Sequence, residues 1–245
     1  MAPSHLSVIE INNLTVDYAH KHALDGLSLS VTRGEIFGFL GPNGAGKSTA
    51  IKTILGLIFP VSGSVTLHGL SPDNPESRRT VGFLPEEANY YRFLTVVEIL
   101  TFYGTICGVA KDAVKRRIPR LLELVGLSEV KNKQVGTFSK GMTQKISLAQ
   151  ALIHEPETLI LDEPTSGLDP LSRMELRQIL KGLKNEGKTI FFSSHELSEV
   201  ELLCDSIAIL KSGRLIKSGP IQEVLGSGER NLERFFVQTI KGDGL

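Results

Sequence analysis

The chain of 245 residues is long enough for one large core with an attached subdomain. Its 27 Lys and Arg balance 27 Asp and Glu, which argues against a polyanion-binding surface and predicts no nucleic-acid partner. No apolar run is long enough to span a bilayer, and the first residues show no secretory signal pattern, so we expect a soluble cytoplasmic chain.

Alternating apolar residues across residues 7–32 predict antiparallel strands with a turn at residues 19–22. The alternation shifts by one residue at Asn12 and Asn13, which indicates a bulge. Residues 64–68 alternate again, and we expect them to join the same small sheet.

A glycine-rich segment follows a short apolar strand at residues 35–40 and leads into a predicted helix at residues 49–55. It fits the phosphate-binding pattern G-x-x-x-x-G-K-[ST] and consists of Gly41, Pro42, Asn43, Gly44, Ala45, Gly46, Lys47, Ser48 and Thr49. The glycines let backbone N–H groups turn toward phosphate oxygens, and the helix adds its positive dipole end. Lys47 is expected to reach the β- and γ-phosphates, and Ser48 to hold Mg²⁺ through its hydroxyl. The sequence therefore predicts binding of a nucleoside triphosphate.

The middle of the chain, residues 86–154, is predicted to be mostly helical. Thr95 and Glu98 have the spacing of a capping box at the start of the first helix. A second amphipathic pattern stops at Gly126 and contains Pro119, which predicts a kink or a break there.

The alternation of strands and helices then resumes. Strands are expected at residues 158–161, 189–192 and 207–210, a hairpin turn at residues 211–214 and a short helix at residues 231–240. Asp169 and Pro170 predict a helix start, with the helix ending near Gly187. The two cysteines, Cys107 and Cys204, match no metal-ligand spacing and are expected to be small buried side chains.

Two carboxylates follow the first of these later strands. Asp162 leaves an apolar strand beside the phosphate loop, where it is expected to hold the Mg²⁺ shell together with Ser48. Glu163 projects in a different direction and is predicted to orient an attacking water.

Residues 7–225 resemble the nucleotide-binding subunit of an ATP-binding cassette (ABC) transporter. The segment 138–142, Phe-Ser-Lys-Gly-Met, matches the family's LSGGQ signature at the start of a third helix that extends to about residue 153, and His195 matches its switch histidine. The resemblance implies ATP hydrolysis in a head-to-tail dimer, with ATP and Mg²⁺ as ligands.

The resemblance also implies roles for single residues. Ser139 and the backbone N–H of Gly141 would bind the γ-phosphate of the ATP that a second ATP-binding subunit holds. His195 would contact the γ-phosphate and help to hold the attacking water, and Asp169 would communicate between the two sites. Tyr18 would stack on the adenine, with packing against the chain's own core as the alternative.

The chain departs from the family pattern at two places. Glu86 stands where the family usually has glutamine; it is expected to approach Mg²⁺ through water, and a merely solvated loop residue is the alternative. Lys140 and Met142 stand in the signature where glycine and glutamine are commonest. Together these residues resemble the subgroup that serves small type-2 exporters, whose membrane domain is a separate chain.

The predicted fold is α/β, a P-loop NTPase (RecA-like) core with a small antiparallel β-subdomain and a helical signature subdomain. Residues 1–85 and 155–228 are expected to form the core, residues 86–154 the helical subdomain and residues 229–245 a C-terminal helix and tail, all within one ABC ATPase domain.

The function implied is ATP-driven dimer closure at the cytoplasmic face of the membrane, which powers a separate integral-membrane subunit. Tyr90, Tyr91 and Phe93 gather in a polar loop and are predicted to anchor that subunit, with packing into the chain's own core as the alternative. The alternative function is a non-transport ABC ATPase, regulatory and ribosome- or DNA-associated. Such relatives usually carry two cassettes or long insertions, and this sequence has neither.

Overall fold

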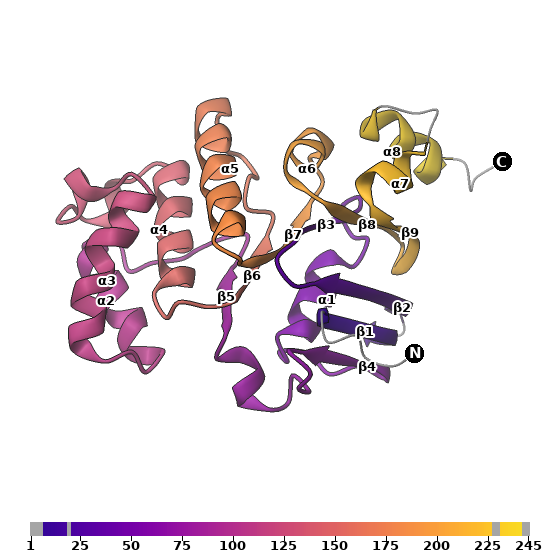
Figure 1. Cartoon of the computed structure of the whole chain (residues 1–245), viewed down its shortest axis with the longest axis horizontal. Helices are drawn as coiled ribbons and strands as arrows, with labels where there is room; N and C mark the ends of the chain where they lie inside the picture. Colours follow the sequence, from indigo (N-terminus) through magenta and orange to yellow (C-terminus); the bar gives the residue numbers. More distant parts are fainter. Residues whose placement is uncertain (1–6, 19–20, 227–230, 242–245) are drawn as a thin grey trace.

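The computed structural model describes residues 7–18, 21–226 and 231–241, which form two sheets and eight α-helices (Figure 1). The smaller sheet is antiparallel, has the order β2-β1-β4, and consists of β1 (Ser7–Tyr18), β2 (Lys21–Thr32) and β4 (Ser62–Leu67). The predicted bulge is confirmed, because both strand pairings of β1 change register at Asn13, whose φ is 46°. Residues 19–20 of the predicted turn lie outside the described residues.

The larger sheet has six strands in the order β5-β6-β7-β3-β8-β9. Its members are β3 (Ile36–Leu40), β5 (Val81–Leu84), β6 (Thr158–Asp162), β7 (Thr189–Ser194), β8 (Ser206–Lys211) and β9 (Arg214–Pro220). All neighbouring strands are parallel except β8 and β9, which form the predicted hairpin. The loops that follow β3, β6 and β7 therefore leave from one edge of the sheet, where ligands of open α/β sheets bind.

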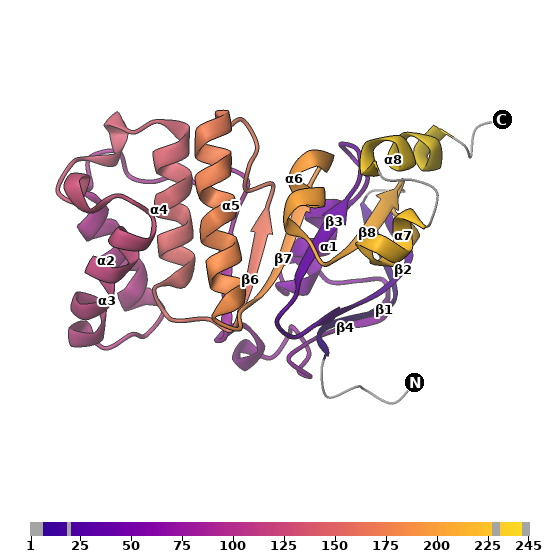
Figure 2. The ribbon, with the colours of Figure 1, turned by 45° about the horizontal axis from the view of Figure 1, so that its top comes forward.

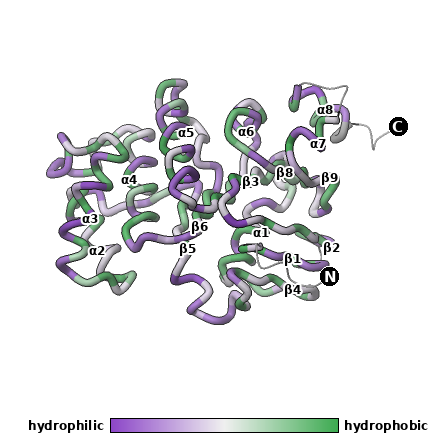
Figure 3. The backbone as a smooth tube through the Cα atoms, in the orientation of Figure 1, coloured by the Kyte–Doolittle hydropathy of each residue, from purple (hydrophilic) through white to green (hydrophobic). Residues whose placement is uncertain are grey.

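The helices divide between the sheets and a separate bundle. They are α1 (Lys47–Ile54), α2 (Val96–Ile106), α3 (Lys111–Leu124), α4 (Lys140–Leu152), α5 (Pro170–Asn185), α6 (Leu197–Leu203), α7 (Ile221–Leu225) and α8 (Leu232–Lys241). Figure 2 shows α2, α3 and α4 together at one end, with α5 between this bundle and the larger sheet. Along these helices, green and purple alternate in Figure 3, as expected for elements with one buried face.

Strand β3 separates two hydrophobic cores because its side chains alternate between the faces of the larger sheet. Ile36 and Leu40 join the core that continues into the helical bundle. Phe37 and Phe39 join the second core, which lies between the two sheets around α1. Phe191 of β7 stacks on Phe37 there, with ring centroids 5.7 Å apart. The helix that follows the phosphate loop, α1, is thus enclosed between the two sheets.

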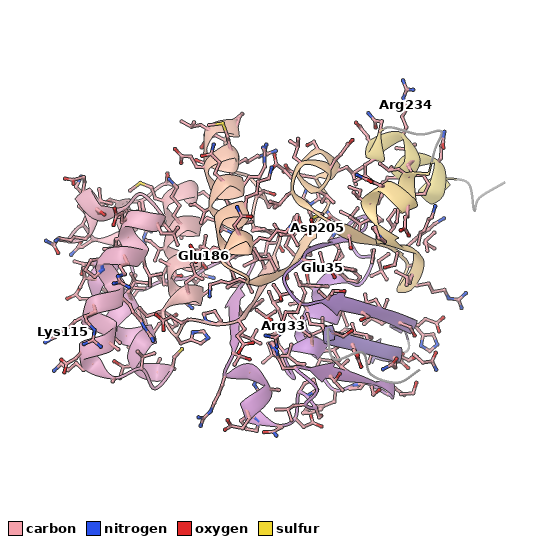
Figure 4. All side chains as sticks on the ribbon, viewed as in Figure 1. Arg33, Glu35, Lys115, Glu186, Asp205 and Arg234 are labelled. Carbon is pink, nitrogen blue, oxygen red and sulfur yellow. The ribbon has the colours of Figure 1, made fainter. Side chains whose placement is uncertain are left out.

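Polar contacts fix the other end of β3. The backbone N–H of Ile36 donates to Asp205 Oδ2 at 2.8 Å, and Ser206 Oγ donates to Glu35 Oε2 at 2.7 Å. Lys184 Nζ lies 2.5 Å from Asp205 Oδ1. Figure 4 shows Glu35 and Asp205 close to the junction between the two sheets. These contacts hold the start of the strand whose far end carries the phosphate loop.

Three sequence-based expectations need correction. The break that was one of the two alternatives at Pro119 does not occur, because α3 continues to Leu124. Pro119 and Lys115, whose carbonyl loses its helical N–H partner, are both exposed, so water can bind that carbonyl. Cys204 is buried as expected, but Cys107 is exposed because it caps the surface end of α2. Tyr90 packs against the bundle core, which makes it unsuitable as an anchor.

Thr95→Ala is expected to lower the free energy of unfolding by about 1 kcal/mol. Thr95 Oγ1 accepts from the backbone N–H of Glu98 at 3.3 Å, and the Glu98 carboxylate accepts from the backbone N–H of Thr95 at 2.8 Å. Thr95→Ser keeps the hydroxyl and is the matched control. Urea denaturation measures both variants, and equal unfolding midpoints would contradict a stabilising capping box.

Candidate functional site

The phosphate loop is held by backbone contacts on both sides. A Cβ atom at Gly41 would lie 2.6 Å from the carbonyl oxygen of Leu210, and one at Gly46 would lie 2.5 Å from that of Ala23, so neither position has room for a side chain. Gly46 also has a φ of 108°, in the region that favours glycine. The turn residue Gly213 donates its N–H to the carbonyl of Ala45 at 2.9 Å. The loop is therefore rigidly positioned between β2 and the β8–β9 turn.

Helix α1 starts at this loop with its N–H groups available. Its N-cap, Gly46, makes no side-chain cap, and the first turn contains no acidic residue. Four backbone N–H groups at a helix start have no partner within the helix, and together with the helix dipole they attract an anion. The end of α1 that faces the loop is thus suited to phosphate oxygens.

A cleft of about 820 Å³ opens above the loop and collects most of the predicted site. Its lining includes these sequence-predicted residues: Tyr18, Pro42, Asn43, Gly44, Ala45, Gly46, Lys47, Ser48, Thr49, Glu86, Glu163 and His195. The volume is in the range of small-molecule sites. Separate segments of the chain converge here, and three of them meet because the sheet order brings the ends of β3, β6 and β7 to one edge.

Glu163 is the centre of a buried polar cluster at the end of β6. Lys47 Nζ lies 3.1 Å from Glu163 Oε1, and it also donates to the carbonyl of Gly41 at 2.7 Å. His195 Nδ1 lies 2.8 Å from Glu163 Oε2, and the His195 backbone N–H donates to the same oxygen at 3.3 Å. Only 7% of Lys47 and 5% of Glu163 are exposed, so this pair is screened little by water. A carboxylate, an ammonium group and an imidazole are thereby brought together beside the phosphate loop.

The donors available for a metal ion are oxygen atoms. Ser48 lines the cleft, and Asp162 is a buried carboxylate directly before Glu163. Among the described residues, no three His, Cys, Asp or Glu side chains form a metal-binding group. One hydroxyl and one carboxylate fit Mg²⁺, which is commonly held by one or two carboxylates, water and substrate phosphates. The residues present therefore fit Mg²⁺ that arrives with a nucleotide.

Ser139 and Gly141 do not line this cleft. Ser139 is exposed at the N-cap of α4, where its Oγ accepts from the backbone N–H of Met142 at 3.2 Å. A Cβ atom at Gly141 would lie 2.8 Å from Ser172 Oγ, so the start of α4 packs against the start of α5. Asp169 caps α5, and hydrogen bonds from the side chain and backbone of Ser172 lower the pKa of its carboxyl. The exposed start of α4, which carries Ser139 and Gly141, therefore lies outside the cleft and beside the start of α5.

The sequence reasoning missed several residues that line the cleft. His22 lies on β2, and its Nδ1 is 2.6 Å from Asp17 Oδ1 on β1. Ser166 and Ser212 come from the turns after β6 and β8. His22 stands four residues after Tyr18 across the same hairpin, and this proximity could have indicated that His22 lines the site. Ser212 is far from any motif, so no local pattern indicates its position.

A phosphate loop at the carboxyl edge of a largely parallel sheet, with two buried carboxylates at the end of β6 on the same edge, defines a P-loop nucleotide-binding domain. The ABC transporter family profile matches residues 24–166, more than half of the sequence. The chain belongs to the ABC transporter family, as its ATP-binding domain.

Known relatives and solved structures agree with this assignment. Uncharacterized ABC transporter ATP-binding proteins of Synechocystis and Nostoc are each 49% identical, over 84% and 90% of this chain, which spans 59% and 65% of their lengths. The bacitracin transport ATP-binding protein BcrA of Bacillus licheniformis is 41% identical, over 93% of this chain and 74% of its own. A solved ATP-binding subunit of an ABC transporter superposes with a TM-score of 0.86 at 34% identity, over 95% of this chain and 99% of that one. The predicted fold class and family are confirmed.

A double-mutant cycle tests the Lys47–Glu163 pair without nucleotide. Lys47→Ala leaves a buried carboxylate without its cation, and Lys47→Ala/Glu163→Gln removes that unpaired charge. The interaction free energy is therefore expected to be about 0.5–3 kcal/mol. Urea unfolding of the parent, both single variants and the double variant measures it. Strict additivity of the two single changes would show that the contact has no energetic weight.

Proposed function

We propose that the chain is the ATP-hydrolysing subunit of an ABC transporter and powers substrate movement through a separate membrane subunit. The observation that carries the proposal is the Glu163 carboxylate, buried between Lys47 and His195 at the phosphate loop. A carboxylate next to a γ-phosphate can orient water for in-line attack, which is the chemistry that a phosphate loop alone lacks.

ATP would bind with its phosphates against residues 41–49 and its adenine against Tyr18. Tyr18 is 47% exposed at the cleft, so its ring is available for stacking. Ser48 and Asp162 would hold Mg²⁺, which neutralises charge on the phosphates when bound. Glu86 would approach the ion through water. The Mg²⁺ dependence of ATP binding, measured in a Glu86→Ala variant, tests this role.

The buried ion pair has a role in the reaction cycle. Lys47 neutralises Glu163 while the loop holds no phosphate, and an arriving γ-phosphate competes for the same ammonium group. Transfer of Lys47 to the phosphate frees the carboxylate to accept a proton from the attacking water. His195 would hold that water and contact the γ-phosphate, since its ring already lies against Glu163.

Glu163→Gln is expected to keep ATP binding and to lower steady turnover by about 10²–10⁴-fold, because an amide cannot accept the proton. An ATP-bound dimer should accumulate. Phosphate release measures turnover, and size-exclusion chromatography with MgATP measures the dimer. Glu157→Gln, an exposed carboxylate outside the cleft, is the control. Turnover close to that of the parent, with the membrane partner present, would remove Glu163 from the catalytic role.

The proposed active unit contains two such chains, or this chain and a related subunit. Ser139 and the backbone of Gly141 lie outside the chain's own cleft but form an exposed helix start. In a head-to-tail dimer this helix start would close over the partner's γ-phosphate. Closure with ATP and reopening after hydrolysis would then shift the membrane subunit between its two conformations.

The membrane subunit is proposed to dock on the helical bundle. No helix in the described residues is both long and apolar enough to cross a bilayer. Tyr91 and Phe93 are each 66% exposed, with ring centroids 5.8 Å apart. Tyr90 instead donates its hydroxyl to Gln150 Oε1 at 2.6 Å inside the bundle. The pair Tyr91 and Phe93 is therefore the anchor, because exposed aromatic pairs mark protein interfaces.

A cationic groove in the helical bundle indicates which kind of segment of the membrane subunit would dock there. The groove has a volume of about 870 Å³ between α2, α3 and residues 128–133, with Val114, Ile118 and Leu122 in its lining. It is rimmed by Lys111, Lys115, Lys131 and Lys133, against one carboxylate, Glu129. The anchor loop is tied to the segment that borders the groove, because the backbone N–H of Val135, two residues after Lys133, donates at 2.9 Å to the carbonyl of Leu94, the residue after Phe93. The docking segment would thus be apolar on one face and acidic at its edges.

The relatives support export as the direction of transport. A protein of Bacillus licheniformis is named for bacitracin transport, one of Bacillus subtilis for linearmycin resistance and one of Cupriavidus pinatubonensis for Nod factor export. By analogy, we propose that this chain serves a type-2 exporter.

Tyr91→Ala/Phe93→Ala is expected to fold, bind ATP and lose most of its association with membranes that contain the partner. The two side chains are mainly exposed, so little packing is lost within the chain. Co-sedimentation with native membranes measures the association. Leu202→Ala, another exposed apolar residue, on α6, should sediment like the parent. Undiminished sedimentation of the aromatic double variant would place the docking surface elsewhere.

A further inference from the structure

A buried serine on β7 links the two carboxylate residues of the site. Ser193 is fully buried, and its Oγ donates to Asp162 Oδ1 at 2.6 Å. Ser193 Oγ also accepts a hydrogen bond from the backbone N–H of Glu163 at 3.0 Å. In the part of the chain that the structure describes, no other residue is hydrogen-bonded to the Asp162 carboxylate or to this N–H.

Strand register produces this contact. Strands β6 and β7 are parallel neighbours, and Asp162 is the register partner of Ser193. The chain turns directly after Asp162, with a φ of 48° at Glu163, a conformation that residues other than glycine rarely adopt. The hydrogen bond to Ser193 holds this turn, and the turn brings the Glu163 side chain to Lys47 and His195.

The chemistry of the position requires a hydroxyl group. A serine hydroxyl can donate one hydrogen bond and accept another at the same time. Alanine would leave a buried carboxylate oxygen and a buried N–H without partners, and both losses are unfavourable. A cysteine thiol is of similar size but is a weak donor and a weak acceptor.

We propose that Ser193 is a positioning residue for Mg²⁺-dependent ATP hydrolysis. It fixes Oδ1 of Asp162, which leaves the other carboxylate oxygen for the metal, and it holds the backbone turn that aims Glu163. Replacement of a residue that orients a metal ligand commonly lowers metal affinity or activity by about 10–100-fold. The inference rests on the roles proposed above for Asp162 and Glu163.

The test separates orientation of the metal ligand from general stability. On the full chain, calorimetry measures ATP affinity at a series of Mg²⁺ concentrations and in EDTA. Ser193→Ala is expected to raise the Mg²⁺ concentration for half-maximal binding about 10-fold or more. Its ATP affinity in EDTA should match that of the parent, because the phosphate loop is unchanged. Turnover with the membrane partner should fall in kcat more than it changes KM.

Two further variants at this position test the hydroxyl itself. Ser193→Thr keeps it and should restore the Mg²⁺ dependence, whereas Ser193→Cys should behave like the alanine variant. Ser77→Ala is the matched control, because Ser77 is buried and donates to the carbonyl of Asn74 at 2.7 Å, outside the cleft. It should lose some stability and keep the parent's Mg²⁺ dependence.

The possible failures are distinguishable. If the parent hydrolyses ATP and Glu163→Gln does not, a Ser193→Ala variant with the parent's Mg²⁺ dependence and kcat overturns this inference alone. A Ser193→Ala variant that loses only stability, as Ser77→Ala should, also overturns it. If Glu163→Gln hydrolyses ATP like the parent, the proposed catalytic function itself fails.

Discussion

The parallel arrangement of β3, β6 and β7 is the constraint on which the site depends. These strands have different neighbours in the sequence but the same direction, so the phosphate loop, Glu163 and His195 all follow strands that end at one edge. The contact between Lys47 and Glu163 forms only because this edge brings residues of β3's loop and β6's end within 3.1 Å. Hydrophobic packing on both faces of the sheet maintains that edge. The two cores therefore hold Lys47, Glu163 and His195 in the positions that the site needs.

Much of this arrangement could be predicted from local sequence chemistry. The phosphate loop, the capping box of Thr95 and the N-cap of Asp169 are recognisable because each depends on residues a few positions apart. Strands β3, β6, β7 and β8 were also recognisable, because buried parallel strands are continuously apolar, whereas β5 was not predicted. These elements are sufficient to define the fold class.

The remainder depends on contacts between distant residues, which no local pattern encodes. Ser193 looks like any serine at the end of a strand until the register of β6 and β7 places it against Asp162. Tyr90 and Tyr91 are adjacent and chemically alike, yet one donates to Gln150 and the other is exposed. Their difference arises from the packing of the loop on α2 and α4, and the loop's own sequence has no periodicity that separates the two.

The close backbone contacts at the phosphate loop also limit which mutations can restore a damaged loop. The atoms that exclude a side chain at Gly41 and Gly46 include the carbonyl oxygens of Leu210 and Ala23, which every amino acid carries. Replacement of a neighbouring side chain cannot remove a carbonyl oxygen. A loss-of-function substitution at either glycine should therefore have no second-site suppressor among the surrounding side chains, and reversion to glycine is the route by which the loop recovers.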